Sequence, residues 1–258
     1  MARFIYIKLI MNLDKPFKSI VLLLLVSFLY SSCSSKKERI LVFSKTEGYR
    51  HESIPVGKLA LIDFGKDLGV EVDTTENADY FIADSLKKYS AVVFLNTTMD
   101  ILNDTQQKAF EGYIKTGKGF LGIHAAADTE YEWSYYGELL GAYFQSHPKI
   151  QEAEFYVTDR SNPATDSLPD RFKREDELYN YKNINPDIHV IVKIDESSYE
   201  GGENGTDHPF VWYHEYDGGR AFYTGMGHTN ESYSDPLFVN IVKGGLLYVL
   251  GKSDLQQQ

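Results

Sequence analysis

The sequence predicts one α/β domain with a doubly wound, mainly parallel sheet, followed by an irregular β-containing second half. Short apolar runs alternate with segments of helical periodicity through residues 40–123, which indicates parallel strands joined by crossover helices. Residues 91–95 (AVVFL) form an uninterrupted apolar run, which is typical of a strand buried on both faces. The 258 residues, 43% of them hydrophobic, are enough for one sizeable core.

Each element of the first half has its own signal. Ser53 is a suitable helix N-cap and Gly69 a suitable helix end, while Asp104 is the expected cap of the following helix. Apolar runs predict strands at residues 40–43, 70–74, 91–95 and 120–123. Helical periodicity predicts helices that cover residues 53–69 and 105–116.

The second half alternates less regularly. We predict strands at residues 154–157, 188–194 and 220–224, polar loops at 161–169 and 197–209, and a closing helix at 235–250. The chain shows no internal repeat and no linker between two domains. We therefore expect a single domain over residues 40–251 and a disordered tail over 252–258.

The charge balance argues against a nucleic-acid partner. The chain carries 26 Lys and Arg against 37 Asp and Glu, which gives a net charge of -11. No cluster of basic and aromatic residues offers a local exception to this acidic field. The sequence therefore predicts no nucleic-acid binding.

Residues 1–32 resemble the signal peptide of a bacterial lipoprotein. Lys15 and Lys18 precede an apolar run at residues 20–26, and small residues follow just before Cys33. The apolar run is shorter than the roughly 20 residues that a membrane-spanning helix needs. We expect cleavage before Cys33 and acylation of its thiol.

Lipidation would use the only cysteine in the chain. Disulfides, thiolate metal sites and cysteine catalysis would then be excluded together. Residues 33–39 would then form a tether between the domain and a lipid on Cys33 that inserts into the membrane. Because residues 34–37 carry no acidic side chain, we expect a protein of the bacterial cell envelope, lipid-anchored at the periplasmic face.

Three histidines follow three of the predicted strands. His51 comes after the first strand, His124 ends the strand at 120–123, and His228 follows the strand at 220–224. Ligands of open parallel sheets bind at the carboxyl ends of strands, so these side chains are candidates for one site. They could act as acids or bases, bind a divalent metal such as zinc, or serve as buried hydrogen-bonding groups.

Two carboxylates are further candidates for the chemistry. Asp128 lies four residues after His124, where on a helix it could orient the imidazole or simply favour the helix dipole. Glu177 could close over the sheet edge as a second acid or base. It could equally pair with Arg171 or Arg174 at the surface.

Several residues are candidates for holding a ligand. Arg50 could bind an anionic or polyhydroxyl group, or lie at the surface. Aromatic rings suit the C–H faces of sugars, although they also form ordinary cores. We assign substrate binding to Arg50, Trp133, Tyr179 and His228, and a packing or supporting role to His147.

Four separated segments resemble the ThuA-like (trehalose utilisation) family in their order. They are TEGYRHESI (46–54), GKGFLGIHAAADT (117–129), DELYNY (176–181) and HPFVWYHEYDGGRAFYTGMGH (208–228). The resemblance implies a flavodoxin-like fold, similar to class I glutamine amidotransferases. Those enzymes carry a nucleophilic cysteine on a tight turn after a strand, where this chain has His124. The resemblance therefore implies that the chain is not an amidotransferase.

The same resemblance implies a carbohydrate as the small-molecule partner. We expect a hydrolase, lyase or isomerase of carbohydrate catabolism that acts on a trehalose-like disaccharide, glycoside or keto-sugar. His124, Asp128, Glu177 and His51 would carry acid/base or metal-assisted chemistry. The alternative is a sugar-binding lipoprotein without turnover.

The lipid anchor can be tested by one substitution. Cys33→Ser removes the thiol that would be acylated, so we expect the protein to leave the membrane fraction and enter the soluble fraction. Fractionation of expressing cells followed by immunoblotting measures the distribution. An unchanged distribution would contradict the anchor.

Overall fold

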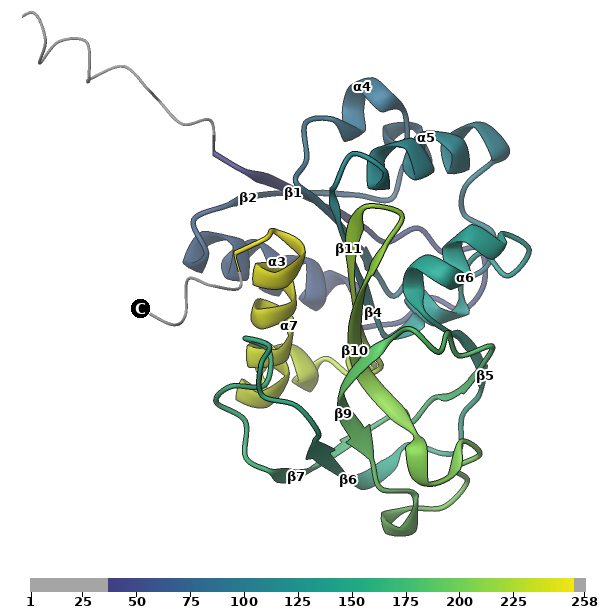
Figure 1. Cartoon of the computed structure of the whole chain (residues 1–258), viewed down its shortest axis with the longest axis vertical. Coiled ribbons are helices and arrows are strands. Elements are labelled where there is room, and N and C mark those ends of the chain that lie inside the picture. The colour runs from purple at the N-terminus through teal and green to yellow at the C-terminus, as the bar shows by residue number, and fades with distance from the viewer. Residues whose placement is uncertain (1–36, 253–258) are drawn as a thin grey trace, which may run out of the picture. The chain divides into compact units, whose positions relative to one another are not determined.

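A computed structural model describes residues 37–252. Cys33, the predicted signal peptide and nearly all of the predicted tail lie outside these residues. The described part contains a nine-stranded sheet in the order β2-β1-β3-β4-β11-β10-β9-β6-β7 and a two-stranded sheet, β5-β8 (Figure 1). None of its helices is long and apolar enough to span a membrane.

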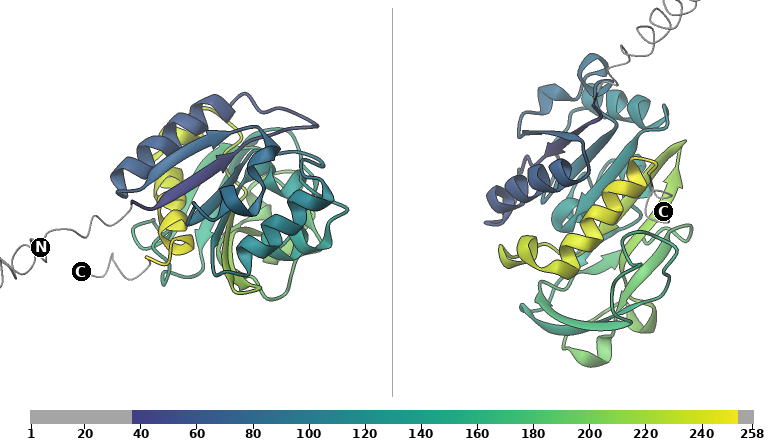
Figure 2. Two further views of the ribbon diagram at one scale, coloured as in Figure 1. Left: turned by 90° about the horizontal axis from the view of Figure 1, so that it is seen from above. Right: turned by 90° about the vertical axis from the view of Figure 1, so that its left-hand side faces the viewer.

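Five strands form the parallel half of the large sheet. They are β1 (Arg39–Phe43), β2 (Glu71–Thr75), β3 (Ala91–Leu95), β4 (Gly119–Ile123) and β11 (Gly219–Thr224). Helices α3 (Ile54–Asp67) and α7 (Pro236–Val249) cover one face, and α5 (Asp104–Ile114) and α6 (Ser134–Leu140) cover the other (Figure 2). Every residue of β3 and β4 is buried, as expected of central strands between two helical layers. The predicted α/β, flavodoxin-like class is confirmed.

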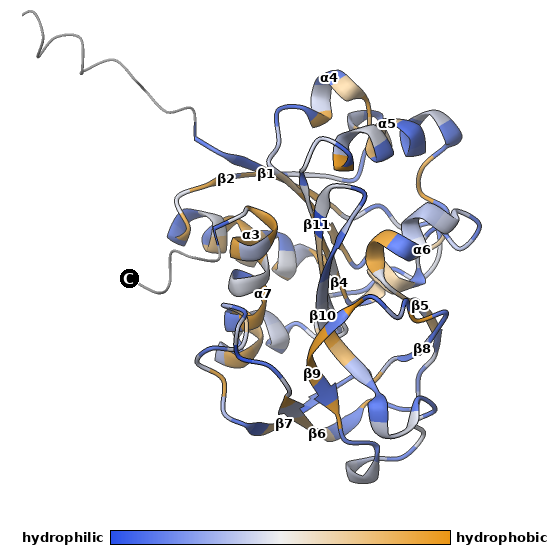
Figure 3. Cartoon of the chain, in the orientation of Figure 1, coloured by the Kyte–Doolittle hydropathy of each residue, from blue (hydrophilic) through white to orange (hydrophobic). Residues whose placement is uncertain are grey.

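Four antiparallel strands extend the sheet beyond β11. They are β10 (Pro209–Tyr216), β9 (His189–Ile194), β6 (Gln151–Val157) and β7 (Arg171–Asp176). The small sheet pairs β5 (Tyr143–Ser146) with β8 (Asn180–Lys182), and a short helix, α4 (Ala83–Leu86), precedes β3. Hydrophobic residues make up much of β9, while many loops are hydrophilic (Figure 3).

The sequence did not predict β7 and β10. In β7, burial alternates along the strand, but two of the three inward positions are the charged residues Arg174 and Asp176. In β10 the first four residues, PFVW, form a buried apolar run, so the signal that predicts β3 was also present here. Hydropathy therefore hides β7 but not β10.

Three local predictions are corrected. Asn103, and not Asp104, caps α5, where it forms a capping box with Gln106. Ser53 occupies the N-cap position of α3 but makes no side-chain capping bond, because its hydroxyl donates to the carbonyl of Gly227. The segment after β4 is a 3₁₀ helix, residues 124–128, and not an α-helix.

Close packing of α7 depends on Gly244. A Cβ at this position would overlap the backbone of Pro163 and Ala164, which cannot move as a flexible side chain can. We expect Gly244→Ala to lower the free energy of unfolding by about 1–3 kcal/mol. Gly112→Ala is the control, because a Cβ there meets nothing within 4 Å and should add about 0.5–1 kcal/mol of helix stability. Urea denaturation measures both, and equal changes would contradict this packing.

Candidate functional site

Three histidines and one glutamate meet at the carboxyl ends of the parallel strands. His51 lies in the loop after β1, His124 directly follows β4, His228 follows β11, and Glu177 follows β7. One nitrogen or oxygen atom of each side chain lies within 4.8 Å of the others. The structure thus brings together the three histidines that the sequence placed at this edge, and adds Glu177 from the antiparallel half. We call these four residues the histidine cluster.

The backbone and one carbonyl fix the ring of His124. Its φ of 49° lies in the left-handed region, which is unusual for a residue with a side chain. Nδ1 lies 2.8 Å from the carbonyl oxygen of Gly225. Because a carbonyl only accepts, Nδ1 must carry a hydrogen and donate it. Nε2 therefore faces the other members of the cluster.

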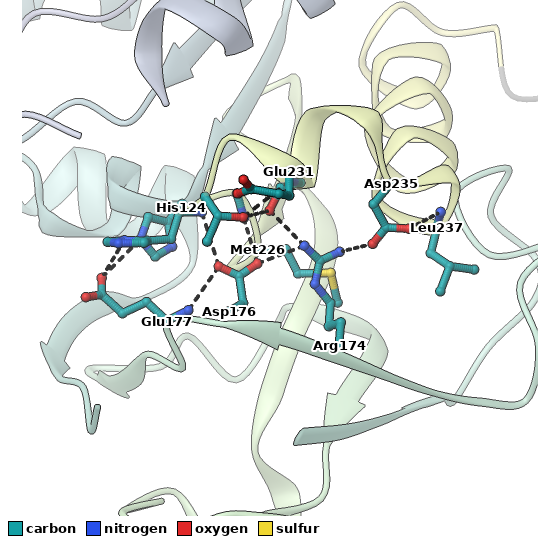
Figure 4. A network of polar contacts seen from close by, with 12 residues as sticks. His124, Arg174, Asp176, Glu177, Met226, Glu231, Asp235 and Leu237 are labelled. Atoms are coloured by element: carbon teal, nitrogen blue, oxygen red, sulfur yellow. Dashed lines mark hydrogen bonds and ion pairs between the residues drawn. The ribbon is translucent and has the colours of Figure 1, made fainter. Parts of the chain in front are cut away.

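Nε2 of His124, Oε2 of Glu177 and Nδ1 of His228 form a nearly equilateral triangle. Figure 4 shows the contact between His124 and Glu177. The glutamate oxygen is 3.2 Å from His124 and 3.1 Å from His228, and the two nitrogens are 3.3 Å apart. The other glutamate oxygen, Oε1, lies 3.3 Å from Nδ1 of His147. Nitrogen and carboxylate donors in this arrangement are those that divalent transition metals use.

The cluster shifts the pKa values of two of its members in opposite directions. Burial would raise the pKa of Glu177, but hydrogen bonds with His124 and His228 hold it well below its usual range. Burial would lower the pKa of His228, yet the neighbouring Glu177 carboxylate raises it. Glu177 is therefore an ionised carboxylate.

The imidazole of His51 has no hydrogen-bond partner among the described residues. The residue is only 3% exposed, and both of its ring nitrogens lack a partner there. Burial, together with the charges of His124 and His228, lowers its pKa to about 2. His51 is thus a buried neutral imidazole, and such an unsatisfied group costs stability unless something fills the site.

A buried ion pair positions Glu177 and His228. The Asp176 carboxylate accepts the backbone N–H groups of Glu177, Gly227 and His228 at 3.0, 3.1 and 3.2 Å. Arg174 donates to Asp176 at 3.0 Å and to Asp235 at 2.9 Å (Figure 4). Sequence reasoning missed this role because nothing in the sequence marks β7 as an inward-facing strand.

The surface pairing considered for Glu177 does not occur. Arg174 is buried and binds Asp176, while Arg171 pairs with Glu154 and Asp195. Burial of Arg174 explains the difference, because its cation is needed beside a buried carboxylate. Glu177 is left free to face the histidines.

Asp128 does not orient His124. Its carboxylate accepts from the Tyr131 hydroxyl at 2.6 Å, and the Gly225 carbonyl orients the imidazole instead. The tight 3₁₀ turn after β4 does not keep the four-residue spacing of an α-helix on one face. Burial raises the pKa of Asp128 above its usual range.

The proposed ligand-holding residues divide into two groups. Tyr179 packs on His124, with ring centroids 4.2 Å apart. Arg50 instead makes a bidentate ion pair with Glu76 at the surface. Trp133 packs in the core and donates to Glu111, so it is not part of the cluster. The aromatic pattern alone could not separate a core tryptophan from a site tyrosine.

An open pocket of about 300 Å³ adjoins the cluster. His228 belongs to both, and Tyr49, 63% exposed, contributes an aromatic face. Two acidic residues, Glu52 and Glu231, line the pocket, and no Lys or Arg does. The loop residue Ile150 supplies a further apolar wall.

The model of one protein family, described as "ThuA: Trehalose utilisation", matches residues 39–249. The chain belongs to the ThuA family. A ThuA-like protein from Bacteroides uniformis has 23% identity and a TM-score of 0.70, over 88% of this chain and 97% of that one. A ThuA-like protein from Parabacteroides merdae has 18% identity and a TM-score of 0.70, over 84% of this chain and 92% of that one.

The fold extends beyond the ThuA family. A GMP synthase protein from Thermoplasma acidophilum has 14% identity and a TM-score of 0.54, over 86% of this chain and 99% of that one. Such low identities establish the fold alone. No curated protein matches the sequence.

The buried ion pair under the site of this ThuA protein can be tested by stability. Arg174→Ala leaves the buried Asp176 carboxylate without its nearest cation, so we expect the free energy of unfolding to fall by about 3–5 kcal/mol. Lys173→Ala is the matched control, since this neighbour on β7 pairs with Glu152 at the surface and should matter little. Urea denaturation measures both. Similar effects of the two substitutions would contradict a structural role for the pair.

Proposed function

We propose that this ThuA protein is an enzyme of carbohydrate catabolism that processes a trehalose-like disaccharide, glycoside or keto-sugar at the histidine cluster. The observation that carries the proposal is the convergence of three imidazoles and one carboxylate beside an open pocket. A role in trehalose utilisation is what the family description suggests.

The protonation states of the histidines in the cluster suit acid/base chemistry. His51 is neutral with both ring nitrogens free, so it can accept a proton from a substrate hydroxyl or from a carbon beside a carbonyl. His228, held by Glu177, is the group that retains a proton to higher pH. Without a bound metal, one site thus offers a base and an acid close together.

The cluster differs from the usual glycosidase site. Glycosidases place two carboxylates across the scissile bond, whereas Glu177 is the one carboxylate in the histidine cluster. Proton abstraction, leading to elimination or isomerisation of an oxidised sugar, therefore fits the residues better than direct glycosidic hydrolysis.

The adjoining pocket supports an uncharged substrate. Glu52 and Glu231 would repel a sugar phosphate or a uronic acid, and no Lys or Arg in the pocket lining offsets them. Tyr49 presents a ring on which the C–H face of a sugar could stack. The anchor at Cys33 would hold the domain at the cell envelope, where such sugars arrive.

Turnover tests this function directly. We expect the purified domain to convert trehalose, another disaccharide or one of their 3-keto derivatives. His124→Asn should lower the rate by at least about 100-fold, because it removes the ring that contacts both Glu177 and the acid His228. Asparagine tolerates the left-handed backbone at this position, so the fold should persist. His189→Ala, at an exposed histidine paired with Asp159, is the control.

Product analysis by chromatography, with and without added divalent metal, measures the reaction. Binding of these sugars without any conversion under every metal condition would overturn the enzyme proposal and leave a sugar-binding protein. Equal rates for wild type and His124→Asn would show that the reaction occurs elsewhere.

A further inference from the structure

We propose that Nε2 of His124, Nδ1 of His228 and Oε2 of Glu177 bind one divalent transition-metal ion, zinc or a metal with similar ligand preferences. The proposal concerns binding alone, so it holds or fails without reference to any sugar. It assigns each ligand atom and leaves His51 outside the set.

The distances fit a shared ion. Donors bound at about 2.0–2.2 Å lie roughly 2.8–3.1 Å from adjacent donors in an octahedral arrangement and roughly 3.3–3.6 Å in a tetrahedral one, so the full interval is roughly 2.8–3.6 Å. The three separations of 3.1, 3.2 and 3.3 Å fall within that interval. Little movement is needed to place an ion at equal distance from all three atoms.

Hydrogen bonds alone cannot join all three atoms of the triangle well. Nδ1 of His124 donates to Gly225, so a neutral His124 turns the lone pair of Nε2 toward Glu177, and only a doubly protonated ring could donate to both. A hydrogen on Nδ1 of His228 can face Glu177 or His124, but not both. A cation at the centre attracts all three lone pairs at once.

The surroundings hold the ligands as metal sites require. Ligating histidines donate their second ring N–H to a carbonyl or carboxylate, as His124 does to Gly225. Nδ1 of His147 lies 3.3 Å from Oε1 of Glu177 and 2.9 Å from the carbonyl oxygen of Pro148, so Oε2 is the oxygen left for the metal in a one-oxygen mode. Asp176 accepts the backbone N–H groups of Glu177 and His228, and so fixes the backbone at both of these ligands.

His51 marks the open side of the site. Its ring lies 4.9 Å from that of His124 and 5.0 Å from that of His228, measured between centroids, and neither nitrogen has a partner among the described residues. A water or substrate hydroxyl in the fourth coordination position would give His51 the hydrogen-bond partner it lacks. The side chains of His228 and Glu177 are 16% and 10% exposed, so the triangle is not sealed from solvent.

Metal titration tests the assignment. The protein is dialysed against a chelator and then titrated calorimetrically with Zn²⁺, Mn²⁺ or Co²⁺, with the bound metal measured by mass spectrometry. We expect one ion per chain for at least one metal. His124→Asn should weaken binding by more than about 100-fold, and His147→Ala by about 10-fold, as for the loss of an outer partner.

Two controls separate this site from adventitious binding. His189→Ala removes an exposed histidine and should bind as wild type does. His51→Ala should keep one ion per chain, because His51 is not a ligand. Circular dichroism shows whether each variant is folded.

Three results would overturn the proposal. They are no binding of any of the three metals by wild type, equal affinity in wild type and His124→Asn, and loss of metal in His51→Ala as complete as in His124→Asn. The first would leave a proton as the occupant of the triangle. A protein that binds metal but converts no sugar would retain this proposal and lose the enzymatic one.

Discussion

The ion pair between Arg174 and Asp176 is the interaction on which the site depends. Both side chains are buried, and removing charge from water is costly unless every oxygen and N–H group finds a partner. Asp176 meets this requirement by accepting N–H groups from its own strand end and from the loop after β11. The carboxylate thereby ties Glu177 and His228, which are far apart in the sequence, into one geometry.

Through Asp176, residues from both halves of the sheet come together in one site. The parallel half delivers His51, His124 and His228 where parallel strands end, as the general rule for such sheets requires. The antiparallel half delivers Glu177, although β7 is the last strand in the sheet order. Neither half alone holds the complete histidine cluster. The ligand-binding edge common to α/β proteins is here completed by the irregular part of the chain.

Sequence reasoning predicted the parallel half because its signals are local. Each strand and helix there has a continuous hydrophobic pattern, and the histidines follow the strands directly. The contact between His124 and Gly225, by contrast, joins residues 101 positions apart, and no pattern in the sequence encodes it. The error on Asp128 has a similar origin, since a five-residue 3₁₀ turn and the start of an α-helix look alike in sequence.

The cluster is also a place where the fold gives up stability. His124 adopts a left-handed backbone, and the buried imidazole of His51 has no partner among the described residues. The backbone cost is the same with or without a ligand, whereas the cost of the unpaired imidazole would be removed by a ligand that hydrogen-bonds to it. A ligand that binds only the folded state stabilises it by mass action. The same atoms that weaken the empty protein would therefore make the occupied one both more stable and chemically competent.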